Sequence, residues 1–190
     1  MPGGKTRWAG YVALGATCAL VIGVYDWNAK SGILELAGAG AADTYYNLLV
    51  QGFRAGQLNV KREPPPGLTQ LADPYDPATS LPYRSLDHYP LQDLSYYQGK
   101  LYLYFGVTPA LVLFWPYVAL TGHHLLHKDA VVIFFSAGFL AGVGLLWAVW
   151  RRYFAELGVG VVAAGALAVG LANFAPAILP RCDVHEVAIS

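Results

Sequence analysis

Long apolar runs without Asp, Glu, Lys or Arg divide this chain into segments. Four of these runs are long enough to cross a membrane, which takes about 20 apolar residues as a helix, or as few as ~17. They lie at residues 9–25, 101–122, 130–150 and 157–180. Length alone therefore does not decide which of them span.

The run at 9–25 has the flanks of a membrane-spanning helix. Aromatic residues stand at both of its ends, as in the aromatic belts of membrane proteins: Trp8, Tyr11, Tyr25 and Trp27. Lys5 and Arg7 precede the run, so a signal peptide is the alternative, but no clear small-x-small cleavage site closes it. We predict an uncleaved anchor. The same two basic residues predict a cytoplasmic N-terminus, with the chain outside after residue 25.

Prolines distinguish the two central runs. The run at 101–122 contains Pro109 and Pro116, each of which removes a backbone donor and tends to kink a helix, whereas 130–150 contains none. If both runs spanned, the arginine pair at 151–152 would lie outside, against the positive-inside rule. We therefore predict that 130–150 crosses and that 101–122 is a re-entrant or juxtamembrane segment. The alternative is a kinked span with both arginines outside.

The last run, 157–180, follows a short cytoplasmic loop at 151–156 and should return to the outside. Its glycines and alanines permit close helix packing. Residues 181–190 then begin a new apolar stretch, so we expect the protein to continue beyond them.

Composition agrees with a membrane protein. Hydrophobic residues make up 56% of the 190 residues and charged residues only 13%, about half the charged fraction of an ordinary soluble domain. The 12 basic and 12 acidic residues balance, which argues against nucleic acid as a partner. Cys18 lies in an apolar run and Cys182 in a polar one, so we do not expect them to form a disulfide.

The outer segment, 26–129, opens with a predicted amphipathic helix at 43–56. Apolar and polar residues fall at helical spacing on two sides, the polar side comprising Asp43, Asn47, Gln51 and Arg54. Gly56 is a suitable C-cap. We expect this helix to lie on the membrane surface. The three prolines within 61–67 predict an extended arm after it.

Several polar residues of the outer segment allow two interpretations. Asp73 and Asp76 each precede a proline, which favours turns over a metal or catalytic site. His123, His124 and His127 lack a complete set of metal ligands, which favours an interfacial loop. Tyrosines are concentrated between residues 45 and 117, where membrane placement is favoured over stacking on sugars. Motifs of hydrolases, NTPases and dinucleotide-binding proteins do not occur.

The order of these features resembles the GT-C membrane glycosyltransferases. One span is followed by a carboxylate that opens a surface helix, Ala42-Asp43-Thr-Tyr-Tyr-Asn-Leu-Leu, and by a long outer loop. Three further stretches are similar to parts of large bacterial membrane proteins of this type: Asp73-Pro-Tyr-Asp-Pro, Asp93-Leu-Ser-Tyr-Tyr-Gln-Gly-Lys-Leu-Tyr-Leu-Tyr-Phe-Gly, and Val184-His-Glu-Val-Ala-Ile.

The resemblance implies that the chain is the N-terminal part of an enzyme of the cell membrane, which is the inner membrane where there are two. Such an enzyme transfers a sugar from a polyprenyl-phosphate carrier to an acceptor on the outer side of that membrane. Asp43 matches the position of the catalytic Asp, where a carboxylate would take a proton from the acceptor hydroxyl; it would alternatively only cap the helix. Asp93 is the second candidate. Candidate groups for binding the substrate are Arg54, Arg84, Lys100, Asn47 and Gln51, with headgroup contact as the alternative for the basic ones.

The sequence thus predicts an all-α, multi-pass membrane protein with three transmembrane helices and an outer loop with juxtamembrane amphipathic helices. No second acidic residue adjoins Asp43, so no cofactor is predicted and a divalent metal has no support. The competing hypothesis is a non-catalytic polytopic protein, either an accessory or anchoring subunit or a transporter fragment. A transporter is less favoured because the predicted spans carry no ionisable residue at mid-membrane depth.

Overall fold

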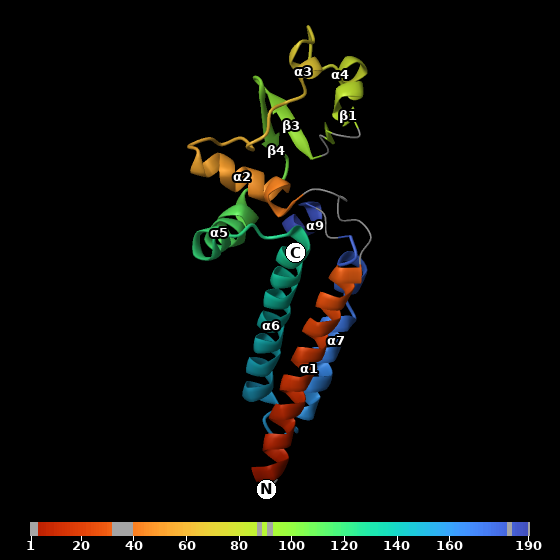
Figure 1. Cartoon of the computed structure of the whole chain (residues 1–190). Helices are drawn as coiled ribbons and strands as arrows, with labels where there is room; N and C mark the ends of the chain where they lie inside the picture. Colours follow the sequence, from red (N-terminus) through yellow and green to blue (C-terminus); the bar gives the residue numbers. More distant parts are fainter. Residues whose placement is uncertain (1–3, 32–39, 87–88, 91–92, 182–183, 190) are drawn as a thin grey trace. The chain divides into compact units, whose positions relative to one another are not determined.

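The computed structural model describes residues 4–31, 40–86, 89–90, 93–181 and 184–189, and within them the chain is mostly helical (Figure 1). It divides into two compact units, which are described separately below. The first comprises Met1–Ala37 and His127–Ser190, and the second comprises Gly38–Leu126.

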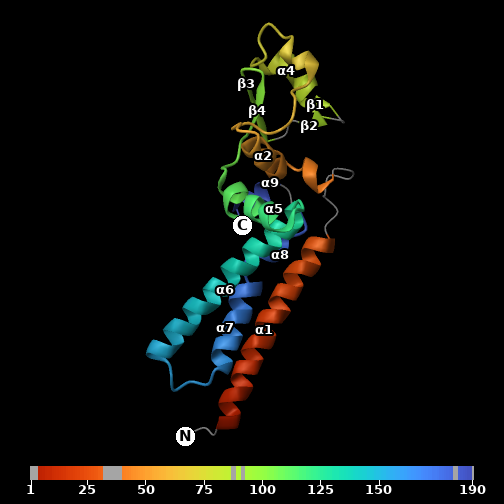
Figure 2. The ribbon, with the colours of Figure 1, turned by 60° about the vertical axis from the view of Figure 1, so that its left-hand side comes forward.

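The first unit is built on three helices that pack against one another: α1 (Gly4–Ser31), α6 (His127–Tyr153) and α7 (Gly160–Leu171) (Figure 2). Three segments are long and apolar enough to cross a membrane: Trp8–Ser31, His127–Tyr153 and Gly160–Ile178. Each contains, or lies within, one of the runs predicted to span. The prediction of a mostly helical chain with three such helices is therefore confirmed.

Two glycines of α7 let these helices approach closely. A Cβ on Gly170 would stand 2.6 Å from Cγ1 of Val21 on α1 and 2.9 Å from Cε2 of Phe139 on α6. A Cβ on Gly165 would stand 2.7 Å from Cδ2 of Leu146. Atoms at these distances overlap, so a side chain at Gly170 would push the helices apart, and one at Gly165 would displace the end of the Leu146 side chain. This is the close packing that the glycines of 157–180 predict.

The last predicted span is not one continuous helix. α7 ends at Leu171, and α8 (Ala175–Ile178) begins after a break. Asn173 lies in the break, where its Nδ2 donates to the Val169 carbonyl at 2.7 Å and its Oδ1 accepts from the Ala175 amide at 2.9 Å. One side chain thus satisfies backbone groups at the end of one helix and the start of the next. α9 (Val184–Ile189) follows α8.

In the second unit, a 3₁₀ turn η1 (Ala41–Asp43) leads into α2 (Tyr45–Arg54). Short helices follow at α3 (Pro66–Thr69) and α4 (Pro77–Arg84), and later come a π-helical turn η2 (Ala110–Phe114) and α5 (Trp115–Thr121). Of the surface helix predicted at 43–56, residues 45–54 form α2, and Asp43 lies in the preceding 3₁₀ turn. The Pro-rich arm is extended at Pro65, but Pro66 opens α3 as its first residue, which proline tolerates because that amide has no partner in a helix.

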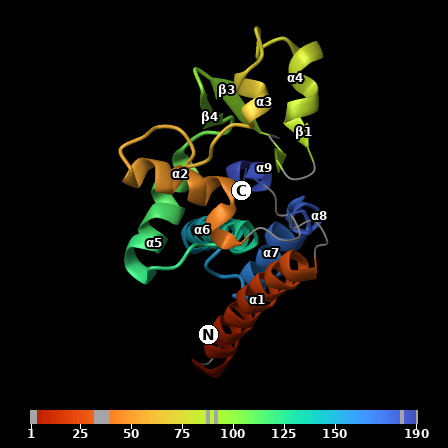
Figure 3. The ribbon, with the colours of Figure 1, turned by 45° about the horizontal axis from the view of Figure 1, so that its top comes forward.

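Protein covers the apolar face of α2. Tyr46 stacks on Phe114 of η2 with ring centroids 5.2 Å apart, and Phe53 lies 6.0 Å from Trp115. Figures 1 and 3 both place α2 beside α5. Tyr46 is 0% exposed. The expectation that this face rests on the membrane surface is therefore wrong, because η2 and α5 occupy it.

Two antiparallel pairs of strands, which the all-α prediction missed, complete this unit. β1 (Ser85–Leu86) pairs with β2 (Tyr89–Pro90), and β3 (Leu94–Tyr97) pairs with β4 (Lys100–Leu103). Gln98 and Gly99 join β3 to β4 with positive φ angles of 47° and 76°, as a two-residue hairpin turn requires. The face with Leu94 and Leu101 is buried and the other is largely exposed. Four residues per strand are too few for alternation to stand out in the sequence.

The apolar segment predicted at 101–122 accordingly begins as a strand. Its helical part, η2 with five residues and α5 with seven, is about 18 Å long at 1.5 Å per residue. The hydrocarbon core of a bilayer is about 30 Å thick. As a single helix this segment is therefore too short to span.

Candidate functional site

Asp43 is the last residue of the 3₁₀ turn η1, and its side chain is exposed. Thr44, rather than Asp43, occupies the N-cap position of α2, and no side chain caps this helix. Oγ1 of Thr44 instead donates to the Ala41 carbonyl at 2.9 Å. The interpretation of Asp43 as a simple helix cap is therefore wrong, and its carboxylate remains accessible to a ligand.

Two amides of α2 hold the turn that carries Asp43. Nδ2 of Asn47 lies 2.8 Å from the Ala41 carbonyl oxygen and 2.8 Å from Thr44 Oγ1, and its two protons are shared among these acceptors and the Leu125 carbonyl. One helical turn further on, Gln51 donates from Nε2 to the Ala42 carbonyl at 2.8 Å. The two carbonyls of the turn that precede Asp43 are thus fixed against the helix. Asn47 and Gln51 thus position the backbone of Asp43, and their predicted contact with a substrate stays a prediction.

Asn47 also ties this turn to the end of the second unit. Its Nδ2 lies 2.7 Å from the carbonyl oxygen of Leu125, 78 positions away in sequence, and its Oδ1 lies 3.3 Å from Nδ1 of His124. Asn47 is 0% exposed, so these contacts are shielded from water. Leu125 precedes the first residue of α6 by two positions. A single buried side chain therefore couples the Asp43 turn to the stretch that enters a long apolar helix.

The basic candidates do not gather around Asp43. Arg54 is exposed at the opposite end of α2, whose ten residues correspond to about 15 Å of helix. Lys100 is exposed at the start of β4. Among the residues that the structure describes, no hydrogen bond or ion pair joins Asp43 to Arg54 or Lys100. The side chain of Arg84 lies outside the described part of the structure.

Asp93, the second carboxylate candidate, has a different backbone role. Its φ angle is +61°, and its carbonyl accepts a hydrogen bond from the Tyr104 amide at 2.9 Å just beyond the β3–β4 pair. Aspartate tolerates this left-handed conformation better than most residues do. Asp93 therefore helps to close the hairpin, a role that its place before the Ser95–Lys100 run did not reveal.

Asp73 and Asp76 form turns, as their place before prolines predicts. Oδ1 of Asp73 accepts from the Tyr75 amide at 2.9 Å, and Oδ1 of Asp76 accepts from the Ala78 amide at 3.0 Å. No group of three or more His, Cys, Asp or Glu side chains that would hold a metal occurs within the described residues. His123 contacts the Thr121 carbonyl through Nδ1 at 2.8 Å.

Tyrosines gather on and near the hairpin. Tyr97 lies edge-on to Tyr102 with centroids 6.4 Å apart, and Tyr75 lies 6.1 Å from Tyr96. Tyr75 and Tyr97 are exposed. The concentration of tyrosine in the sequence therefore corresponds, in part, to a surface of ring pairs.

Asn47 is the residue whose role the sequence least revealed. An amide between Tyr46 and Leu48 in a helix with one apolar side marks a buried polar group that needs partners. That pattern predicts hydrogen bonds but does not identify the carbonyls of residues 41 and 125 as their acceptors.

In comparisons with known proteins, this chain matches no family model, no curated protein and no solved structure.

Proposed function

We propose that this chain is the front part of a membrane glycosyltransferase, in which Asp43 is the general base. The donor would be a sugar on a polyprenyl-phosphate carrier, and the acceptor a hydroxyl compound on the outer side of the cell membrane. The proposal rests on the resemblance of the sequence to GT-C enzymes and on the setting of Asp43. The observation that carries it is the Asn47 side chain, which holds the Asp43 turn and the Leu125 carbonyl together.

This link supports a reaction at the membrane surface. A chain advances at most about 3.6 Å per residue, so Leu125 lies within about 7 Å of the residue that starts α6. A carrier phosphate would lie at the headgroup level, where a spanning helix enters the membrane. A carboxylate coupled to that entry point would lie near the bond to be broken.

The proposed chemistry is a single displacement. The Asp43 carboxylate would accept the proton of the acceptor hydroxyl while that oxygen attacks the anomeric carbon of the sugar. The bond from this carbon to the phosphate oxygen breaks, and the polyprenyl phosphate leaves with the electron pair. Because Arg54 lies at the other end of α2, charge neutralisation of the leaving phosphate would fall to a basic group outside that helix.

The proposed topology places the N-terminus in the cytoplasm and the second unit outside. The helix of η2 and α5 supports an interfacial position for this unit, because it exposes apolar residues: Leu111, Val112 and Leu120. Leu120 is 87% exposed, and only residues 122–126 separate the helix from α6. An apolar face tethered so close to a spanning helix would rest in the outer leaflet.

Asp43→Asn tests the catalytic role, with Glu63→Gln as the matched control at another exposed carboxylate of the same unit. The measurement is transfer of label from a set of radiolabelled polyprenyl-phosphate monosaccharides by membranes containing the full protein. Loss of one general base should lower the rate by about 10²–10⁴-fold in Asp43→Asn and leave Glu63→Gln unchanged. Equal rates in both variants would remove Asp43 from the reaction.

A non-catalytic accessory or anchoring subunit is the second candidate. The observation that favours it is the distance of Arg54 from Asp43, which leaves the carboxylate without a cation from its own helix. Under this hypothesis the wild-type protein would transfer no label from any of the donors, although it inserts and folds normally.

A further inference from the structure

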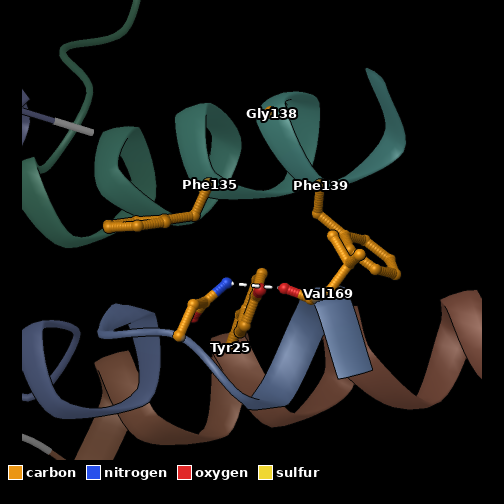
Figure 4. Close-up of a pocket in the computed structure, with 6 residues that line it drawn as sticks. Tyr25, Phe135, Gly138, Phe139 and Val169 are labelled. Carbon is orange, nitrogen blue, oxygen red and sulfur yellow. Dashed lines mark hydrogen bonds between the residues drawn. The ribbon is translucent and has the colours of Figure 1, made fainter. Parts of the chain in front are cut away.

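A cavity of about 160 Å³ lies between the three long helices of the first unit (Figure 4). Its lining comes from α1, α6, α7 and the break after α7: Tyr25, Phe135, Gly138, Phe139, Val169 and Asn173. The ring of Tyr25 lies edge-on to Phe135 and to Phe139, with centroids 6.1 Å apart in both pairs. Figure 4 places these three rings around the space between α6 and the other two helices.

The polar groups of the lining are occupied by the helices themselves. The Tyr25 hydroxyl donates to the Gly170 carbonyl at 2.7 Å, in a buried contact. Asn173 uses both ends of its amide on the backbone of residues 169 and 175. No charged side chain lines the cavity. The larger part of its surface is aromatic and aliphatic, which favours an apolar bound group.

The cavity has an open side. Tyr25 and Phe139 are buried at its base, whereas Gly138, Val169 and Asn173 are exposed. All three helices contribute segments that are apolar and long enough to cross a membrane, so the exposed side would face hydrocarbon. Phe135 lies about 12 Å along α6 from its first residue, a depth at which lipid chains surround a spanning helix.

The volume fits one small apolar group. An engineered protein cavity of about 150 Å³, also lined by apolar side chains, remains free of water and binds benzene. A cavity of this size therefore holds a ring, a branched five-carbon unit or a few methylenes, and not a whole lipid. The remainder of a long chain would extend through the open side.

We propose that this cavity binds a segment of an aliphatic lipid chain. The site is formed by α1, α6, α7 and the break after α7, and it does not depend on Asp43. The ligand is therefore defined by its chain chemistry, which an acyl chain of the bilayer and the isoprenoid chain of a lipid carrier share. Only the isoprenoid chain would connect the cavity to the proposed transfer reaction.

Gly138 offers a way to fill the cavity without disturbing the helices. A Cβ built on Gly138 meets no atom within 4 Å, and the same is true of Gly144, which lies on the same helix outside the lining. Leucine is accommodated in a helix better than glycine at both positions. Gly138→Leu should therefore occupy the cavity, and Gly144→Leu is its matched control.

The experiment is photolabelling of the full protein in lipid vesicles. One arm uses a phospholipid with a diazirine in its acyl chain, and the other uses an isoprenoid phosphate with a diazirine in its chain. Labelled positions are mapped by mass spectrometry. We expect label at the lining residues of the wild type and of Gly144→Leu, and about tenfold less label in Gly138→Leu. Burial of about two methylene groups of the ligand contributes a factor of about this size to binding.

The two arms identify the source of the chain. If excess isoprenoid phosphate does not reduce labelling by the phospholipid, the cavity holds bilayer lipid. If excess isoprenoid phosphate does reduce that labelling, the cavity holds the chain of a lipid carrier. Equal labelling of Gly138→Leu and Gly144→Leu, or no label at the lining residues, would overturn the proposal. Should Gly138→Leu unfold at a lower temperature than Gly144→Leu, Val169→Phe fills the cavity from α7 and decides the question. Loss of transfer in Asp43→Asn with unchanged labelling would separate this site from the catalytic one.

Discussion

The side-chain nitrogen of Asn47 donates a 2.7 Å hydrogen bond to the carbonyl of Leu125, and the same nitrogen donates to the carbonyl of Ala41 at 2.8 Å. These bonds join the two ends of the second unit through one buried amide. The turn that carries Asp43 and the stretch before α6 are therefore positioned together. Any change at Asn47 affects both.

We predict that Asn47→Ala destabilises the second unit. The variant leaves the Leu125 carbonyl without its buried donor, which costs about 1–3 kcal/mol in the free energy of unfolding. Gln57→Ala, at an exposed amide beyond the same helix, is the control. Limited trypsin digestion in detergent measures the effect, because Lys61 and Arg62 lie in this unit. Equal cleavage rates in both variants would show that the Asn47 contacts contribute little.

We predict that the stability of the second unit falls between pH 10 and pH 12. Burial raises the pKa of Tyr46 to about 12 from the usual 10.0. Below pH 10 the Tyr46 hydroxyl is protonated in both the folded and the unfolded protein, so its contribution to stability does not change with pH. Above pH 10 the unfolded chain loses the proton that the folded chain retains, so folding becomes less favourable by up to about 3 kcal/mol.

Tyr46→Phe should abolish this decline, because it retains the ring that stacks on Phe114 but has no proton to lose. Tyr104→Phe, at an exposed tyrosine, is the control and should leave the decline in place. Unfolding in denaturant at a series of pH values, followed by near-UV circular dichroism, gives the comparison. An unchanged pH dependence in Tyr46→Phe would assign the decline to other groups.

We predict that Gly170→Ala loosens the bundle of α1, α6 and α7. The added methyl group would overlap Val21 and Phe139, and overpacking of this kind costs about 1–3 kcal/mol. Gly144→Ala meets no neighbouring atom and should keep or raise stability, since alanine favours a helix by about 1 kcal/mol over glycine. The unfolding temperature in detergent should fall for the first variant alone. A rise in both would mean that the helices at Gly170 have room to separate.

We predict that the second unit and the end of α6 lie on opposite sides of the membrane. In a background with Cys18 and Cys182 replaced by serine, a cysteine at Gln57 should react with an impermeant thiol reagent in intact cells. A cysteine at Arg152 should react only after permeabilisation, because α6, which is long and apolar enough to cross a membrane, would separate the two sites. Efficient labelling at Arg152 in intact cells would mean that the 101–122 segment also crosses. Protection at Gln57 would reverse the proposed orientation.

The sequence by itself determined the long helices. The runs at 9–25 and 130–150 each identify one helix, and the run at 157–180 identifies α7 and α8, because length and hydrophobicity are local properties of a segment. The same is true of the turns at Asp73 and Asp76, where the carboxylates bond to amides two residues away. Helix α2 was likewise visible in the spacing of its apolar residues, from Tyr46 to Phe53.

Only the tertiary structure decided what covers each surface. The apolar face of α2 fits lipid or protein equally well in sequence, and the contact between Tyr46 and Phe114, 68 positions apart, selects protein. The acceptors of Asn47 and the cavity beside Tyr25 also require segments that are distant in the chain. Their geometry depends on the folded path of the backbone, because a side chain can bond only to groups that folding brings within about 3 Å.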